Sequence, residues 1–309
     1  MRTLITGGAG FIASHIVDTY LAEGFEVAVF DNLSSGKRTN LPPSVQIYEG
    51  DICNVEQLAS ALSDFEPDIV NHHAAQVSVI VSTQDPRQDA TRNVLGTVSV
   101  LDACTKAGVT QFIYAASGGS MYGLPLHTPC DETTPVNPLS PYALSKYTGE
   151  QYVKLWERLY GLPATVLRYG NVYGPRQDPH GEAGVCAIFT SRLLAGEPVK
   201  IFGDGTQIRD YVSVSDVARA NLLAVGKGIG ESVNIGTGLP TTTRQVFETI
   251  KSATGYTSEA TQAPARNGEV QEIVLDVHKA EQVLGWKPAI SFSDGIAKTV
   301  AWYRSQIHG

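Results

Sequence analysis

The chain has 309 residues, of which 42% are hydrophobic and 17% charged, and its formal net charge is −8. A chain of this length can bury a large core, and the acidic balance argues against a protein that binds nucleic acid or an anionic membrane. No apolar run approaches the roughly 20 residues that span a bilayer. The N-terminus has no secretory signal pattern, so we expect a cytoplasmic protein.

Short apolar strands alternate with amphipathic helices through the first half of the chain. Strands are expected at residues 2–6, 26–31, 45–51, 68–75 and 111–117, and helices at about 10–23, 54–64 and 86–107. The strands are nearly continuous runs of Val, Ile and Phe, as in a parallel sheet that is covered on both faces. The alternation predicts a doubly wound α/β sheet.

The pattern continues to about residue 170 and then changes. A helix near 142–160 and a strand at 164–170 complete the alternation. Loops and short strands follow, with helices at about 182–195, 214–226, 242–254 and 294–306, while residues 232–236 could return to the main sheet. We predict one domain over 1–170 and a smaller mixed α/β region over 171–309 that covers the carboxyl ends of the strands.

A glycine-rich turn separates the first strand from the first helix. Gly7, Gly10 and Ala13 fit the pattern G-x-x-G-x-x-A, in which the glycines permit a tight turn close to a pyrophosphate. The N–H groups and dipole at the start of the helix then favour the anion. The turn predicts a Rossmann-type dinucleotide site.

Asp31 ends the second strand, about 20 residues after these glycines. A carboxylate there can accept hydrogen bonds from both ribose hydroxyls and repel a 2′-phosphate, which favours NAD over NADP. The nearby Lys37 and Arg38 could bind a 2′-phosphate and leave NADP as an alternative. Asp51 and Ile52 follow the third strand and are placed to meet the adenine.

Tyr142 and Lys146 lie four residues apart in SPYALSK, hence on one face of a helix. The helix begins after Pro141, with Ser140 as the expected N-cap. A neighbouring ammonium and a cationic nicotinamide ring would lower the pKa of the tyrosine from its usual value near 10. The pair predicts proton transfer coupled to hydride transfer at an alcohol carbon.

A hydroxyl that polarises the substrate oxygen should stand near this pair. AASGGSMYG, at residues 115–123, offers Ser117 and Ser120 at the end of the fifth strand. Either serine could instead be a turn residue bonded to its own backbone. We select Ser117 and keep Ser120 as the alternative.

The four cysteines are scattered without C-x-x-C spacing, so we expect free thiols. His72 and His73 follow a strand and have no spacing typical of metal ligands, so packing is the expected role and no metal is expected.

With these features the chain resembles the extended short-chain dehydrogenase/reductase family, and within it the UDP-glucose 4-epimerases. The similarity covers nearly the whole chain through TGGAGFIASH, DNLSSG, GDI, HHAAQ, RNVLGT, YALSK, RYGNVYGPRQDP, GDGTQIRDYV and NIGTG. It implies a tightly held NAD, a transient 4-keto sugar and inversion at C4 of a UDP-hexose. It also implies a homodimer whose helices around 86–107 and 142–160 pair with those of the partner.

The resemblance assigns roles to individual residues. Tyr142, Lys146 and Ser117 are the catalytic set. The implied NAD contacts are Gly7, Gly10, Phe11, Ile12, Asp31, Asn32, Ser35, Gly36, Asp51, Ile52, Ala74, Ala75, Gln76, Asn93, Tyr142, Lys146 and Tyr169. The implied UDP-sugar contacts are Ser117, Asn171, Phe202, Arg209, Arg266 and Glu269, so the region after residue 171 would bind the nucleotide sugar.

The turn after the fifth strand departs from many members of this family. Many carry the catalytic Ser or Thr at the position of Gly118, whereas 4,6-dehydratases place Asp at the position of Gly119 and Glu at that of Ser120. The missing acids favour epimerisation. Two alternatives stay open: another NAD-dependent nucleotide-sugar enzyme, such as a UDP-glucuronate or UDP-pentose 4-epimerase or a decarboxylase, and a non-catalytic sensor.

Overall fold

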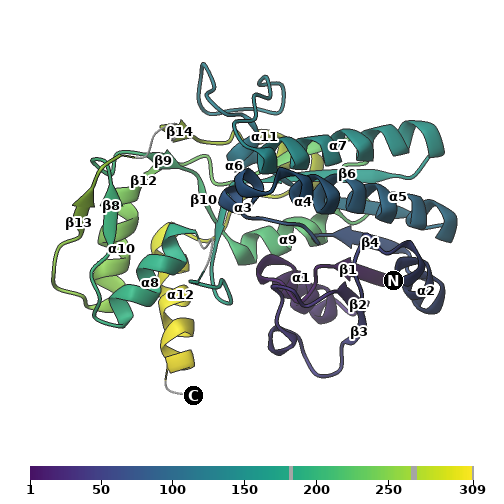
Figure 1. Ribbon diagram of the computed structural model, residues 1–309, viewed down its shortest axis with the longest axis horizontal. Helices are drawn as coiled ribbons and strands as arrows, with labels where there is room; N and C mark the ends of the chain where they lie inside the picture. Colours follow the sequence, from purple (N-terminus) through teal and green to yellow (C-terminus); the bar gives the residue numbers. More distant parts are fainter. Residues whose placement is uncertain (181–183, 266–269, 308–309) are drawn as a thin grey trace.

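The chain folds around one seven-stranded parallel sheet, seen on the right of Figure 1. This computed structural model describes residues 1–180, 184–265 and 270–307. The strand order is β11-β6-β5-β4-β1-β2-β3, so the order reverses between β1 and β4, where ligands of such sheets bind. The strands are β1 (Arg2–Thr6), β2 (Glu26–Asp31), β3 (Gln46–Glu49), β4 (Ile69–His72), β5 (Gln111–Ser117), β6 (Ala164–Tyr169) and β11 (Ser232–Ile235).

Helices cover both faces of this sheet, which explains the continuous apolar strands. On one face, α2 (Val55–Phe65), α5 (Gly96–Ala107) and α7 (Pro141–Tyr160) pack over side chains such as Phe112 and Tyr114. On the other, α1 (Phe11–Ala22) and α9 (Val214–Ala224) pack together over the sheet. The predicted doubly wound α/β fold is confirmed.

The helix that carries Tyr142 and Lys146 is fixed at both ends by local sequence. The Ser140 hydroxyl accepts a hydrogen bond from Ala143 N at 3.1 Å, and Pro141 occupies the first turn. The helix ends at Gly161, whose φ of +68° is costly for other residues. The predicted N-cap is therefore confirmed.

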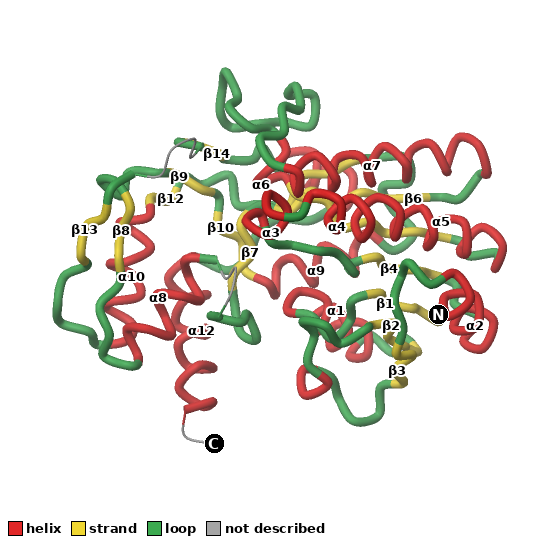
Figure 2. Tube along the Cα trace, viewed as in Figure 1, coloured by secondary structure: helices red, strands yellow, loops and turns green. Residues whose placement is uncertain are grey.

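A second group of helices packs together at the left of Figures 1 and 2. These helices are α8 (Val185–Leu194), α10 (Thr243–Thr254) and α12 (Phe292–Ile307). Figure 2 shows the small strands beside them in yellow. They are β7 (Asn171–Tyr173) with β10 (Tyr211–Ser213), β8 (Lys200–Phe202) with β13 (Thr261–Ala263), and β9 (Ile208–Arg209) with β12 (Thr241–Thr242) and β14 (Glu272–Ile273).

Some elements after residue 171 belong to the main sheet and its helices and not to this second group. Strand β11 pairs in parallel with β6 at the edge of the main sheet, as 232–236 was expected to do. Helix α9 packs against α1, and α11 (His278–Leu284) packs against β11 and α9. The division of the molecule at residue 171 stays a prediction.

Three short helices carry too little periodicity to be seen in the sequence. They are α3 (Val79–Gln84), α6 (Gly118–Met121) and α11. The helix expected over 86–107 is continuous, but it consists of α4 (Pro86–Ala90), a π-helical turn (Thr91–Leu95) and α5. In the ranges that the structure describes, no helix combines the length and the apolarity needed to cross a membrane.

Candidate active site

The glycine turn lies directly against the segment that follows β4. Gly7 has a φ of +68°, and a Cβ there would lie 2.6 Å from Ala74 N. Only glycine therefore allows this approach. The turn brings Gly7 together with Ala74, two of the residues predicted to contact the dinucleotide.

Helix α1 begins immediately after this turn, with Gly10 as its N-cap. No side chain in the described part of the chain caps it, and its first turn holds no acidic residue. The backbone N–H groups around Phe11 and Ile12 are thus left for an anion. The turn and helix fit the diphosphate of a dinucleotide.

Asp31 is held in a fixed orientation beside the glycine turn. Its side chain is buried, and its two oxygens accept hydrogen bonds from Ala9 N at 2.9 Å and Leu33 N at 2.8 Å. Burial raises the pKa of Asp31, and these two bonds oppose the rise. A carboxylate has about four acceptor positions, so two remain for the ribose hydroxyls, and the residue fits NAD.

Further residues predicted to contact NAD lie in the segments after β2 and β3. Asn32 donates to Asp51 at 3.1 Å, and Ile52 is buried against Gly96. Ser35 and Gly36 lie in the loop after β2, where a Cβ on Gly36 would lie 2.8 Å from the Ala9 Cβ. This loop therefore rests on the glycine turn.

The two cations that could have favoured NADP both have protein partners. Lys37 Nζ lies 3.2 Å from Asp178 Oδ2. The Arg38 guanidinium donates to the backbone carbonyls of Pro42, Pro43 and Val45. Neither is held ready for a 2′-phosphate, which supports NAD as the cofactor.

Asn93 and Gln76 connect the segment after β4 to the neighbouring helices. The Asn93 amide exchanges hydrogen bonds with the backbone of Gln76 and donates to Asp89 at 3.1 Å and to Ser145 at 3.0 Å. The Gln76 side chain bonds within its own loop and to Asp89. Because Ser145 is on α7, Asn93 ties the segment after β4 to the helix of Tyr142.

Tyr169 has its hydroxyl on the α9 side of the sheet. Its oxygen accepts from Asn221 at 2.8 Å and lies 3.1 Å from His73 Nε2. Burial lowers the pKa of His73 to about 3. His72 is hydrogen-bonded to Thr6 and Thr97. Among the described residues, no group of three or more His, Cys, Asp or Glu is arranged to hold a metal ion.

Tyr142 and Lys146 lie on the face of α7 that is turned to the sheet. Lys146 is 5% exposed, and its Nζ lies 4.4 Å from the centre of the Tyr114 ring. Burial lowers the pKa of Lys146 to about 7, opposed by the charge of Asp89. Burial also raises the pKa of Tyr142, and a hydrogen bond with Ser117 opposes that rise. The lowered pKa of Tyr142, which the sequence argument expected from an ammonium together with a cationic nicotinamide ring, is therefore not found in the protein alone.

Ser117 ends β5 and adjoins Tyr142, while its hydroxyl makes no cap bond to the following turn. This removes the interpretation of Ser117 as a turn serine. The Ser120 hydroxyl donates to that of Ser117 at 2.8 Å. Catalytic candidates from β5 and α7 thus meet at the carboxyl edge of the sheet.

The residues predicted to bind the UDP-sugar come from several small strands. Asn171 begins β7, and its Oδ1 lies 3.0 Å from the position of a Cβ on Gly119. Phe202 ends β8 and Arg209 ends β9; both are half-buried. Arg266 and Glu269 lie outside the described residues.

A loop over residues 175–178 contacts both α1 and α12, and none of its residues was among the predicted site residues. His15 Nε2 lies 2.9 Å from Pro175 O, and Arg176 pairs with Asp18 at 2.7 Å. The Tyr303 hydroxyl donates to Gln177 O. With the Lys37–Asp178 pair, the loop connects the cofactor side to the second group of helices. The string GPRQDP was the only signal for it.

The chain is similar to known proteins over almost its whole length. The profile of the NAD dependent epimerase/dehydratase family matches residues 3–236. The UDP-glucose 4-epimerase of Mycolicibacterium smegmatis is 46% identical over 99% of both chains. That of Thermotoga maritima, solved with UDP-glucose, is 48% identical and superposes with a TM-score of 0.97 over 99% of this chain and 100% of its own. That of Thermus thermophilus, solved with NAD, is 46% identical with a TM-score of 0.94 over 98% and 99%. The chain belongs to the NAD dependent epimerase/dehydratase family.

Proposed function

We propose that this protein is a UDP-glucose 4-epimerase, which interconverts UDP-glucose and UDP-galactose by inverting C4 through a 4-keto sugar. The observation that carries the proposal is the meeting of Ser117, Tyr142 and Lys146 at the carboxyl edge of the sheet, beside a turn that fits NAD. Relatives of 46–48% identity over almost the whole chain have this activity in their names.

The protein holds NAD through the elements around Gly7, Gly10 and Asp31, which take the diphosphate and the adenosine ribose. When bound, NAD would supply the hydride acceptor and donor for C4 and, in its oxidised form, a positively charged ring. Lys146 lies one turn after Tyr142 and holds the nicotinamide ribose. Asn93 holds the segment after β4 against α7 through its hydrogen bonds to Gln76 and Ser145.

Tyr142 moves the proton. Its phenolate takes the proton of the sugar's 4-hydroxyl, and it returns the proton to the same oxygen after the keto sugar has turned. The Lys146 ammonium stabilises the phenolate against the burial that raises the pKa of Tyr142. Ser117 donates a hydrogen bond to O4, where negative charge develops.

The nucleotide part of the substrate is held by the second group of elements. We assign the diphosphate to Asn171, Arg209 and Arg266, and the uridine to Phe202 and Glu269. Asn171 supports this assignment because it adjoins the turn of Ser117 and Ser120. The sugar would then reach Tyr142 from the side of β7.

The structure offers no acid for dehydration in the turn after β5. An added Cβ at Gly119 would lie 3.0 Å from Asn171 Oδ1, so an aspartate there would meet that amide oxygen. Ser120 stands where decarboxylases and dehydratases usually carry glutamate. This favours epimerisation over elimination.

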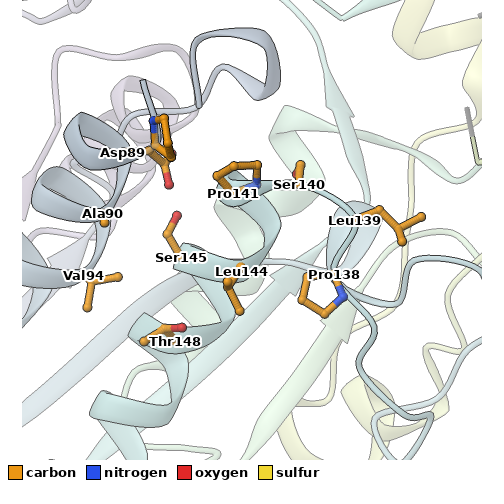
Figure 3. Close-up of a pocket in the computed structure, with 11 residues that line it drawn as sticks. Asp89, Ala90, Val94, Pro138, Leu139, Ser140, Pro141, Leu144, Ser145 and Thr148 are labelled. Carbon is orange, nitrogen blue, oxygen red and sulfur yellow. The ribbon is translucent and has the colours of Figure 1, made fainter. Parts of the chain in front are cut away.

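The same proposal includes a homodimer. Figure 3 shows a hollow between α4 and the start of α7, and its volume is about 550 Å³. Leu139 and Leu144 at its rim are 51% and 53% exposed. On the helix expected over 86–107, Leu101 is fully buried in the monomer core and takes no part in this interface. Large exposed apolar patches usually mark interfaces.

Light scattering tests the dimer, with an expected mass of twice 33.1 kDa. Leu144→Lys should lower that mass towards one chain. Leu239→Lys is the matched control, because Leu239 is equally apolar and 65% exposed but lies just before β12. A monomeric unmodified protein at micromolar concentration contradicts the dimer.

We place the activity in the cytoplasm, because all four cysteines are free thiols and a reducing compartment preserves them.

The function is tested by incubating the purified protein with a panel of UDP-sugars, without added NAD, and identifying products by NMR. We expect interconversion of UDP-glucose and UDP-galactose by the cofactor that co-purifies. Conversion of UDP-glucuronate or a UDP-pentose alone would contradict the hexose assignment. Absence of any product from a protein that contains NAD would contradict enzymatic function.

A further inference from the structure

Two serine hydroxyls and a tyrosine lie close together at the edge of the site. Ser120 Oγ donates to Ser117 Oγ at 2.8 Å, and the Ser117 side chain lies close enough to Tyr142 to oppose the rise in the pKa of that phenol. Ser117 is the last residue of β5, and Ser120 lies three residues later in the single turn of α6. The spacing places both hydroxyls on the same side of the turn.

Neither hydroxyl is needed to build the turn. Ser117 precedes α6, yet its side chain makes no cap bond to it. The partner found for the Ser120 hydroxyl is Ser117 and not a backbone carbonyl. Serines in turns usually bond to the local backbone, so this pair points to a role beyond the turn.

Each serine hydroxyl has only one proton to donate, and this fixes the direction of the hydrogen bonds. A serine hydroxyl has one donor and two acceptor positions. Because Ser120 donates to Ser117, that acceptor position of Ser117 is filled and its own proton is directed elsewhere. The neighbouring side chain is Tyr142, beside which O4 of the sugar must lie for proton transfer.

The two intervening glycines hold the serines in this arrangement. A Cβ on Gly118 would lie 2.9 Å from Leu275 Cδ1 and 3.1 Å from Arg168 O. A Cβ on Gly119 would lie 3.0 Å from Asn171 Oδ1. The turn is therefore packed closely between β6 and the segment of Leu275. This packing keeps the Ser117 and Ser120 hydroxyls next to each other.

We infer that Ser120 is a positioning residue, which orients the Ser117 hydroxyl as a donor to the oxygen that Tyr142 deprotonates. The inference rests on the proposed 4-epimerase function. Ser120 itself does not touch the reacting atoms. It acts by removing the alternative orientations that the Ser117 proton would otherwise take.

The test compares Ser120→Ala with Ser120→Thr. Loss of one orienting hydrogen bond should lower kcat about three- to tenfold and leave KM and NAD content unchanged. Ser120→Thr retains a hydroxyl and should restore most of kcat. Ser305→Ala on the exposed end of α12 is the control for a serine-to-alanine change. An unchanged kcat in Ser120→Ala overturns the inference.

A double-mutant cycle with Ser117→Ala separates positioning from direct contact. If Ser120 acts through Ser117, Ser120→Ala should have less than about a twofold effect in the Ser117→Ala background. Equal effects in both backgrounds would mean that Ser120 contacts the substrate independently. A larger loss in Ser120→Ala than in Ser117→Ala would make Ser120 the donor. Both results overturn the inference.

A crystal structure of Ser120→Ala distinguishes failure of this inference from failure of the proposed function. We expect the Ser117 side chain to occupy more than one rotamer. That result stands even if the protein converts no UDP-sugar, in which case only the proposed function fails. A single unchanged Ser117 rotamer overturns the positioning role.

Discussion

Leu275 fills the space beside Gly118. An added Cβ at that glycine would lie 2.9 Å from Leu275 Cδ1 and 3.1 Å from the carbonyl oxygen of Arg168. Leu275 is fully buried and belongs to the core between the sheet and α7. The position at which many relatives carry their catalytic hydroxyl is thus closed by packing in this protein.

Gly118→Ser should consequently destabilise the protein without raising turnover. Overpacking of a filled site typically costs about 1–3 kcal/mol, which thermal unfolding would report as a lower Tm. Gly118→Ser combined with Leu275→Ala opens the space and should recover part of that loss. A Gly118→Ser protein with normal Tm and higher turnover would contradict the packing argument.

Tyr142→Phe should retain the fold and NAD and lose at least a hundredfold in turnover, since general acid–base groups typically contribute 10²–10⁴-fold. Product formation by NMR, together with the NAD content of the purified variant, checks this. Tyr160→Phe at the exposed end of the same helix is the matched control. Near-normal turnover of Tyr142→Phe would remove this residue from the mechanism.

Ser117→Ala should lower turnover by about ten- to a hundredfold, because a donor aimed at developing charge is worth up to about 4 kcal/mol and a shifted donor gives less. NAD content should change little. Steady-state kinetics with UDP-galactose measure the loss. A normal rate would show that another group polarises O4.

Asp31→Ser should shift cofactor preference towards NADP, because it removes the charge that repels a 2′-phosphate. The shift should be limited while Lys37 is paired with Asp178, so Asp31→Ser with Asp178→Asn should accept more NADP than Asp31→Ser alone. Mass spectrometry of the extracted cofactor gives the ratio. NADP in the unmodified protein would overturn this reading of Asp31.

Glu150→Gln should destabilise the fold and change its pH dependence. Glu150 is fully buried on α7 and pairs with Arg168 on β6 at 2.6 Å. Burial alone would raise the pKa of Glu150, but Arg168, Lys154 and Ser232 lower it overall. Removing one partner of a buried pair costs about 3–5 kcal/mol.

The sign of the pH effect follows from the lowered pKa of Glu150. Its contribution to stability is present above the unfolded-state pKa and is lost as the pH falls through the lower folded-state pKa. Urea unfolding from pH 7 down to pH 3 should therefore show a decline in the free energy of unfolding. That decline should be smaller in Glu150→Gln, and an equal decline in both proteins would assign it to other carboxylates.

The sequence predicted most of what depends on local pattern. The apolar strands, the Gly7 turn, Asp31 at the end of β2 and the Tyr142–Lys146 face were all readable because each is set by spacing along one element. Contacts between distant segments were not. Leu275 beside Gly118, Asp178 beside Lys37, and the burial that dominates the pKa of Tyr142 depend on where separate elements meet. The roles of Arg266 and Glu269 stay predictions.

The interleaving of the chain has a consequence for how this protein can be recombined with its relatives. Residues 1–170 alone lack β11, which pairs with β6, and α9, which covers α1. That piece would carry an open strand edge and an uncovered apolar helix, both of which promote aggregation. A chimaera that takes residues 171–309 from another enzyme must match two inherited interfaces, β6 with β11 and α1 with α9, before any new substrate specificity can be expressed.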